Sequence, residues 1–460
     1  MVVRRGPEPR VNDAACQPVA TDSTRPPPRR RSLATNTVYA VGGTGFYHVC
    51  QLGVLMLLAK FATPEISGQY FLALAIATPI VLFCGLELRG AFVADAGGQF
   101  AFGTYRRLCE LAMAPAAGAL IAYVIWQAAC GTAPAYLLIL AGVFAAKIVW
   151  AIAEVGWGTY QKRERLDLLA GSVGLRALTL IVPFAIFLPL LHWLCTTGRL
   201  GPSHLAYGTA LGVLGHAVGV LAVLLLFDNP RVLDARQWEL RTTGAALGRL
   251  AVQTFPLGVV ALVINLCDTL PRLVIESQPN GKAQLGYFGS LAYITLAGNL
   301  VIIQTAAAAA NRLSLYYRTD VRAFCRLGGL LTAAALGVGV SVLVIAWLFG
   351  GWILRVLYTP AFAQFEREFL LIVFAHCLAL LTNVFGTATT QMRLFWVQVP
   401  VQLLTLVSTA AAALLLIPGD QPVLGAAYTT LVRASVQLVL YWTCVALGLA
   451  FRRRIVGGGG

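Results

Sequence analysis

The feature that most constrains this chain is a series of long apolar runs, which recurs from residue 36 to residue 450. Each run can cross a hydrocarbon core of roughly 30 Å, which takes about 20 helical residues at a rise of about 1.5 Å per residue. Charged residues make up only 12% of the 460 residues, about half of the share that is usual in a soluble domain. We therefore predict an all-α polytopic membrane protein.

Twelve membrane-spanning helices are expected, and no connection between them is long enough to fold as a separate domain. Their approximate ranges are 36–59, 66–86, 108–129, 134–156, 167–190, 205–227, 250–271, 286–308, 327–349, 368–386, 394–417 and 424–449. The chain then divides into a disordered basic cytoplasmic tail (residues 1–35), an N-terminal six-helix lobe (36–227), a cytoplasmic linker (228–249), a C-terminal six-helix lobe (250–450) and a short cytoplasmic tail (451–460).

The positive charge of the chain, +15 in total, is distributed unevenly along the predicted spans. Of the 34 lysines and arginines, 25 lie in the tails and even-numbered connections, six in the odd-numbered connections and three inside spans. Cytoplasmic loops carry an excess of these residues, so we predict that both termini are cytoplasmic and that the chain lies in a bacterial inner membrane. Topology thus accounts for the basic charge, and no nucleic-acid partner is expected.

No motif of covalent catalysis or metal binding is present. The ten cysteines are scattered, without a CxxC pair or metal-ligand spacing, and neither a phosphate-binding glycine loop nor a nucleophile constellation occurs. Membrane polymerases and glycosyltransferases generally carry carboxylates on a sizeable external loop, which this chain lacks. We therefore expect no catalytic residue, metal or cofactor, and we disfavour the alternative that the chain is a membrane polysaccharide polymerase.

Short matches between the two halves indicate an internal repeat. At an offset of 218, Gly68-Gln69-Tyr70-Phe71 matches Gly286-Tyr287-Phe288. At an offset of 219, Tyr105, Arg107 and Leu108 match Phe324, Arg326 and Leu327. At an offset of 230, Gln161 and Arg163 match Gln391 and Arg393. Because six is an even number of spans, the two halves enter the membrane in the same orientation. Two parallel lobes around a central cavity are the architecture of a transporter.

Two stretches resemble bacterial polysaccharide flippases of the multidrug/oligosaccharidyl-lipid/polysaccharide exporter superfamily. They are residues 61–75, which read FATPEISGQYFLALA, and the counterpart from Leu270 to Phe288. The resemblance also covers span count, loop lengths and the repeat. It implies a flippase that moves an undecaprenyl-pyrophosphate-linked oligosaccharide, a polysaccharide or O-antigen repeat unit, to the outer leaflet by alternating access. Membrane lipid, a polysaccharide polymerase and glycosyltransferases are the implied partners.

Charged residues inside the spans are the first candidates for a substrate site, because related lipid II flippases carry cations in the cavity that face the pyrophosphate. A charge at a helix centre costs roughly 2.5 to 3.5 kcal/mol on insertion scales and needs a partner or a wet cavity. Lys147 and Arg176 lie at similar depths in neighbouring spans and would suit a diphosphate. The alternatives are a Lys147–Glu154 pair and an Arg176 side chain that snorkels inward. Arg433 is a third candidate cation.

Two counterpart spans each carry a polar stripe at helical spacing. The stripes are Thr44, Tyr47, His48 and Gln51 in the first span, and Asn265, Asp268 and Arg272 in the seventh. We expect both to line the cavity; the alternatives are an interhelical hydrogen bond for His48 and an internal Asp268–Arg272 ion pair. Interhelical hydrogen bonds are also expected for His216, Asn299, Gln304, His376, Asn383, Gln398 and Gln402.

The leading interpretation is a lipid-linked oligosaccharide flippase. Export of a pyrophosphate anion across an inside-negative membrane releases about 2.3 kcal/mol per charge per 100 mV, so the potential alone could drive it. A cation-coupled multidrug exporter of the same superfamily is the second interpretation, and it would require a buried acidic residue to bind the coupling ion. A non-transporting scaffold of envelope assembly is a further alternative.

Overall fold

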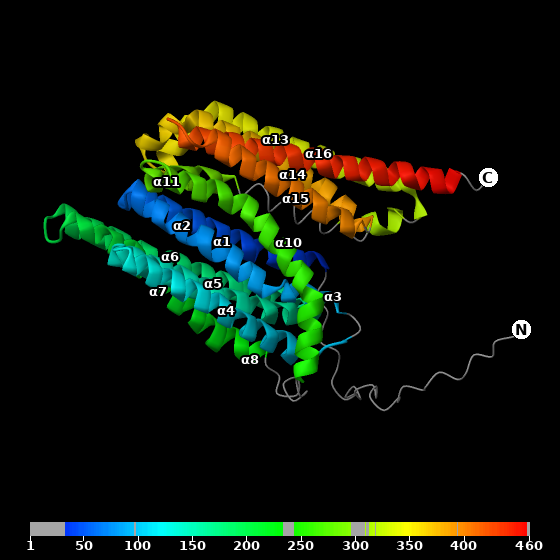
Figure 1. Ribbon diagram of the computed structural model, residues 1–460, viewed down its shortest axis with the longest axis horizontal. Coiled ribbons are helices and arrows are strands. Elements are labelled where there is room, and N and C mark those ends of the chain that lie inside the picture. The colour runs from blue at the N-terminus through cyan, green and yellow to red at the C-terminus, as the bar shows by residue number, and fades with distance from the viewer. Residues whose placement is uncertain are drawn as a thin grey trace, which may run out of the picture.

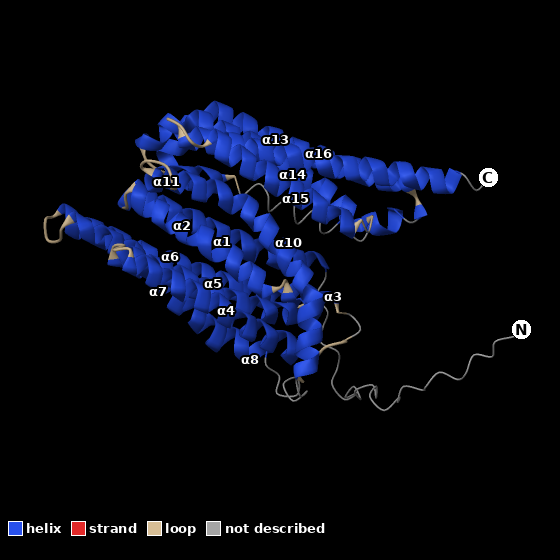
Figure 2. Ribbon diagram, in the orientation of Figure 1, coloured by secondary structure: helices blue, strands red, loops and turns tan. Residues whose placement is uncertain are grey.

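The computed structural model describes residues 33–95, 98–232, 243–295, 309, 312–317, 319–392 and 394–457, and all regular secondary structure in these ranges is helical (Figure 2). The elements are α1 (Leu33–Phe61), α2 (Pro64–Gly85), α3 (Leu88–Ala94), α4 (Phe102–Ala129), α5 (Pro134–Lys162), α6 (Leu166–Thr196), η1 (Pro202–His204), α7 (Leu205–Val223), η2 (Leu224–Asp228), α8 (Asn229–Val232), α10 (Gly244–Glu276), α11 (Gly281–Ile294), α13 (Val321–Leu357), η3 (Pro360–Phe365), α14 (Glu366–Gln391), α15 (Phe395–Leu416) and α16 (Pro422–Gly457).

Eleven helical segments in the described ranges are long and apolar enough to cross a membrane. The predicted eighth span, 286–308, begins in α11, and its residues 296–308 lie outside the described residues. The start of α1 and the end of α16 lie at the same end of the bundle (Figure 1). That placement requires an even number of crossings, as expected for twelve spans.

The helices form two groups that correspond to the two halves of the chain (Figure 1). In the N-terminal half, α1 packs on α6, α6 on α7, and α5 on both α4 and α7. In the C-terminal half, α14 packs on α13 and α16, and α15 packs on α10 and α16. The halves meet where α2 packs against α10 and α11, and the Thr269 hydroxyl donates a hydrogen bond of 3.3 Å to the Ala75 carbonyl there.

Helix ends in the two halves agree with the repeat read from the sequence. α4 begins at Phe102 and α13 at Val321, so their first residues are 219 positions apart. Gln161 lies one residue before the end of α5, and its counterpart Gln391 is the last residue of α14. The repeated sequence therefore occupies equivalent structural positions, although the exact lobe boundaries stay a prediction.

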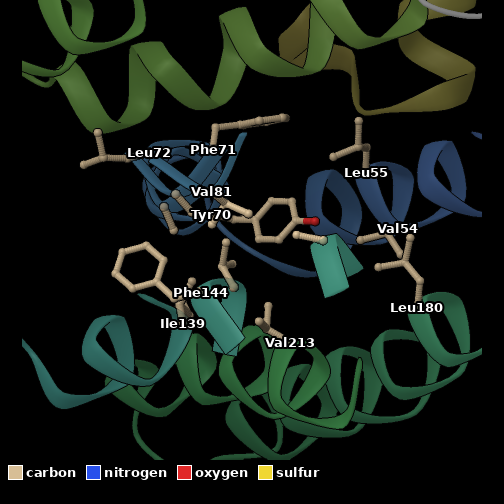
Figure 3. Close-up of a cluster of buried hydrophobic side chains, with 14 of the residues drawn as sticks. Val54, Leu55, Tyr70, Phe71, Leu72, Val81, Ile139, Phe144, Leu180 and Val213 are labelled. Atoms are coloured by element: carbon tan, nitrogen blue, oxygen red, sulfur yellow. The ribbon is translucent and has the colours of Figure 1, made fainter. Parts of the chain in front are cut away.

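An apolar core runs through the N-terminal half and continues past α2 into the C-terminal half. Figure 3 shows side chains of its N-terminal part from α1, α2, α5, α6 and α7; they include Val54, Leu55, Tyr70, Phe71, Leu72, Val81, Ile139, Phe144, Leu180 and Val213. Since lipid tails are as apolar as leucine, close packing rather than removal from water stabilises such a core. The core therefore joins the two halves through α2.

The closest approach between the halves is a crossing of two glycines near the starts of α2 and α11. A Cβ atom on Gly68 would lie 1.7 Å from the Lys282 carbonyl oxygen, and one on Gly286 would lie 2.1 Å from the Pro64 carbonyl oxygen. Each glycine thus touches the carbonyl four residues before the other, so the crossing obeys the symmetry of the repeat. The absence of a side chain at both positions lets the halves close at this end.

A short helix that the sequence did not predict, α3, follows α2 at the opposite end of the bundle. Beyond it, the Asp95 carboxylate accepts hydrogen bonds from the backbone N–H groups of Gln99 and Phe100, at 3.0 and 3.2 Å, and from the Tyr105 hydroxyl at 3.2 Å. Partial burial acts to raise the pKa of Asp95, but these hydrogen bonds and nearby Lys162 outweigh it and hold the pKa below its usual value. The carboxylate therefore fixes the connection between α3 and α4.

Candidate functional site

A cavity of about 590 Å³ lies in the C-terminal half, between α10, α11, α14, α15 and α16, and α2 contributes Phe71 and Leu74 to its wall. Its volume is typical of small-molecule sites, which measure about 300 to 1,000 Å³. Three charged side chains predicted from the sequence line it: Asp268, Arg272 and Arg433. The remaining polar lining consists mainly of amides and hydroxyls from α14, α15 and α16.

Asp268 and Arg433 form an ion pair on one wall of this cavity. Two guanidinium nitrogens of Arg433 bind the two carboxylate oxygens of Asp268, the second pair at 3.3 Å. The sequence had allowed an ion pair between Asp268 and Arg272 within α10; the structure pairs Asp268 with Arg433 of α16 instead. Bidentate geometry with arginine is the stronger arrangement for a carboxylate. The charge of Arg433 is thereby balanced within the protein.

Arg272 is the cation of the cavity wall whose charge is not balanced in this way. α10 continues to Glu276, so Arg272 lies inside the helix, whereas the sequence placed it just beyond the span. Its Nε atom is buried and has no hydrogen-bond partner among the described residues. No described carboxylate lies within 4.0 Å of its guanidinium, although Asp268 attracts it more strongly than Arg433 repels it.

Lys147 of α5 is a second cation inside a span, and it belongs to the N-terminal half. Electrostatic attraction by Glu154 acts on it more strongly than repulsion by Arg272. The Lys147–Glu154 ion pair that the sequence allowed does not form: Glu154 accepts a hydrogen bond of 3.0 Å from the Trp150 indole, and no described carboxylate lies within 4.0 Å of Lys147. Lys147 and Arg272 are therefore cations of opposite halves that have no ion pair in the described part of the chain.

Arg176, the other cation predicted beside Lys147, is sealed inside the N-terminal half. Its side chain is 0% exposed, and its Nη2 atom lies 2.8 Å from Oδ2 of Asp228. Ser172 also accepts a hydrogen bond from the guanidinium, and the rings of Trp150 and Trp157 lie 5.8 and 5.2 Å from it. Arg176 is thus neutralised and enclosed.

The sequence missed Asp228 because the sixth span was predicted to end at residue 227. In the structure a π-helical turn, η2, continues the helix as far as Asp228, and its carboxylate is 2% exposed. The extra residue of a π-helical turn rotates the side chains that follow, and such turns are frequent at functional sites. Tyr160 donates a further hydrogen bond of 3.4 Å to Asp228. The sequence did hold a signal for this ion pair: an acidic residue directly follows the apolar run of the sixth span, and the neighbouring span contains a single arginine.

The two predicted polar stripes lie on helices that pack on different neighbours. α1 packs mainly on α6, whereas α10 packs on α2 and α15. Tyr47 lies against Trp150, with ring centroids 5.0 Å apart, and against His48 at 5.8 Å. Thr44 and Gln51 are partly buried on α1. Asn265 donates a hydrogen bond of 2.8 Å to the Ala261 carbonyl in its own helix.

Several residues expected to make interhelical hydrogen bonds do so. His216 lies 3.3 Å from the Thr179 hydroxyl, and His376 lies 2.9 Å from the Thr295 hydroxyl. The Gln402 amide donates a bond of 3.0 Å to the Tyr441 hydroxyl between α15 and α16. The predicted residues Asn299 and Gln304 lie outside the described residues.

Similar proteins fall into one group. A capsular polysaccharide biosynthesis protein, CapF of Staphylococcus aureus, is 23% identical over 400 residues, which cover 86% of this chain and 94% of CapF. An inward-facing MATE-family multidrug transporter of the MOP superfamily superposes with a TM-score of 0.66 at 12% identity and covers 90% of this chain and 96% of its own. The lipid II flippase MurJ, in its inward closed conformation, gives 0.66 at 11% identity, with 92% and 93% covered. No protein-family model matches the sequence.

The chain has the fold of MOP-superfamily transporters. The predicted fold, an all-α polytopic membrane protein of about twelve spans in two lobes, is confirmed. A MOP transporter of Pyrococcus furiosus, with a TM-score of 0.60 at 13% identity over 92% of this chain and 95% of its own, is described as having a binding pocket of reversed polarity. One MOP fold thus carries pockets of different charge, so the function has to be argued from the polar groups of the site.

Proposed function

We propose that this protein flips a polyprenyl-pyrophosphate-linked oligosaccharide from the cytoplasmic to the outer leaflet of a bacterial inner membrane by alternating access. The observation that carries the proposal is a pair of cations inside the spans, Lys147 and Arg272, one in each half. Neither has an ion-pair partner in the described part of the chain, and the charge of Arg272 acts on Lys147 across the halves.

Cations inside a membrane span that have no ion-pair partner call for an anion or water beside them. A diphosphate has two charged groups that an arginine and a lysine can bind at once, the arginine in bidentate fashion. The CapF relative, named for capsular polysaccharide biosynthesis, supports a lipid-linked sugar as the carrier of that diphosphate.

A cation-coupled multidrug exporter fits the acidic residues less well. Such a protein would need a carboxylate that can exchange a proton or sodium ion. Three carboxylates in or at the ends of the spans are engaged: Asp268 binds Arg433, Asp228 binds Arg176, and Glu154 accepts the Trp150 indole N–H. The net positive lining instead favours an anionic cargo.

Alternating access requires that the halves separate at one end while they close at the other. The Gly68–Gly286 crossing closes the end at which α2 and α11 begin. With both termini in the cytoplasm, as the distribution of Lys and Arg supports, this is the outer end. The described state would then receive its cargo from the cytoplasmic side, where glycosyltransferases assemble it. After it has been flipped, the cargo would supply a polymerase at the outer leaflet.

The test is removal of the two cations in cells that make the lipid-linked sugar. Lys147→Gln and Arg272→Gln, singly and together, should reduce arrival of the sugar in the outer leaflet, with the double variant the most impaired. Lys60→Gln and Arg199→Gln remove the same charges at exposed positions on the outer connections and should transport normally. Normal transport by the double variant, at equal expression, would exclude this pair as the diphosphate site.

A further inference from the structure

Part of the lining of the C-terminal cavity, next to its charged residues, is built from uncharged polar side chains. These side chains include Asn383 and Thr390 of α14, Gln398 and Gln402 of α15, and Gln437 and Tyr441 of α16. Amides inside a membrane span are costly unless they are hydrogen-bonded. One interhelical pair would suffice to join two helices, so the number gathered around a single cavity calls for another explanation.

These side chains hold one another in fixed orientations. Gln402 donates to the Tyr441 hydroxyl at 3.0 Å, and Gln437 donates to the Gln402 carbonyl oxygen at 3.4 Å. Gln398 donates to the Thr390 hydroxyl at 2.9 Å. An amide nitrogen has two N–H donors and an amide oxygen has two lone pairs, so each glutamine keeps hydrogen-bonding capacity beyond these bonds. The network thus presents oriented donors and acceptors to the cavity.

We propose that this wall binds the sugar residues next to the pyrophosphate. Sugar hydroxyls both donate and accept hydrogen bonds, and amide and hydroxyl side chains can answer both roles without a net charge. The inference rests on the proposed function, because Arg272 lines the same cavity and places the phosphate end of the substrate at its charged wall. The first sugar is bonded directly to that phosphate, so it must occupy the adjoining space, which the amides line.

The repeat shows that the Asn383 amide belongs to one half only. At the offset of 230 that joins Gln161 to Gln391, Asn383 corresponds to Ala153. Ala153 is fully buried in the apolar core of the N-terminal half. An amide is therefore not a general property of this helix position in the fold, and Asn383 marks a difference between the two halves.

The experiment measures binding of two probes to the purified full chain in nanodiscs: farnesyl pyrophosphate, and farnesyl pyrophosphate that carries an N-acetylhexosamine. Wild-type protein should bind the sugar-bearing probe more tightly. Gln402→Leu should weaken binding of the sugar-bearing probe by about tenfold, since it deletes hydrogen bonds to the sugar. It should leave the affinity for the bare probe unchanged. Gln127→Leu, on α4 away from the cavity, is the matched control and should bind both probes as wild type does.

Gln437→Leu is the milder variant, because it leaves the Gln402–Tyr441 bond intact, and it serves if Gln402→Leu does not fold. Equal binding of both probes by the wild type would overturn the proposal, as would an unchanged preference for the sugar-bearing probe in a folded Gln437→Leu variant. Loss of binding of the bare probe is the result expected for Lys147→Gln and Arg272→Gln. A wild-type protein that binds neither probe would instead refute the proposed function, so the two failures are distinct.

Discussion

The glycine crossing between α2 and α11 predicts that a single methyl group can open one end of the transporter. In Gly286→Ala the new Cβ atom would lie 2.1 Å from the Pro64 carbonyl oxygen and 3.1 Å from the Gly68 nitrogen. Both neighbours are backbone atoms and cannot rotate away, so the helices must move apart by about 1 Å to reach an ordinary contact. Overpacking of this kind costs about 1 to 3 kcal/mol.

That cost falls on the closed state alone, because separated helices accommodate the methyl group freely. The ratio of outward-open to outward-closed molecules should therefore rise by about 5-fold to 150-fold, at about 1.4 kcal/mol per factor of ten. The assay is labelling of a single cysteine, Leu74→Cys on the cavity wall, in a chain without its other cysteines. A membrane-impermeant maleimide is added from outside, and its labelling rate reports the open population.

Gly337→Ala is the matched control, since a Cβ atom on Gly337 of α13 meets nothing within 4 Å. It should leave the labelling rate unchanged. If Gly286→Ala folds normally and labels no faster than the control, the crossing is not the closure of the outer end and the reasoning is wrong.

Three further predictions concern stability and driving force. Arg176→Gln should destabilise the chain by about 3 to 5 kcal/mol because it leaves Asp228 buried without its partner. The double variant Arg176→Met, Asp228→Leu should unfold near the wild-type temperature in detergent. An equal loss of stability in the single and double variants would argue against the ion pair. Asp95→Asn should lower the melting temperature at pH 7, and the deficit should shrink below about pH 4, since a carboxylate of depressed pKa stabilises only while ionised; a constant deficit would contradict this. Collapse of the membrane potential should slow flipping in vesicles, and dependence on a proton or sodium gradient alone would refute a potential-driven mechanism.

The sequence was sufficient for the fold because apolar length and the side preference of lysine and arginine are local properties that lipid imposes on each span. It predicted the start of α2 to within two residues, and the offset of the repeat matches the starts of α4 and α13. It missed α3, whose seven residues are too short to be distinguished from a connection. It also ended the sixth span at residue 227, whereas η2 and α8 carry the helix on to Val232.

The site was predicted less completely because pairing between helices is not visible along a single helix. Spacing alone allowed Asp268 to pair with Arg272 and Lys147 with Glu154. Packing between helices instead pairs Asp268 with Arg433, and Glu154 accepts a hydrogen bond from Trp150 one turn away in the same helix. The rearrangement leaves Lys147 and Arg272 as the cations without described ion-pair partners. The amide wall was read as single interhelical bonds because its members lie on three helices that only the fold brings together.

The central claim, that the chain flips a lipid-linked oligosaccharide, is tested most directly by reconstitution of the purified wild-type protein in liposomes. A fluorescent polyprenyl-pyrophosphate-linked oligosaccharide placed in one leaflet should become accessible to a sugar-specific reagent in the other leaflet faster than in protein-free liposomes. The Lys147→Gln, Arg272→Gln double variant should not accelerate this step. Transport of an organic cation by the wild type, with no movement of the lipid-linked sugar, would contradict the account.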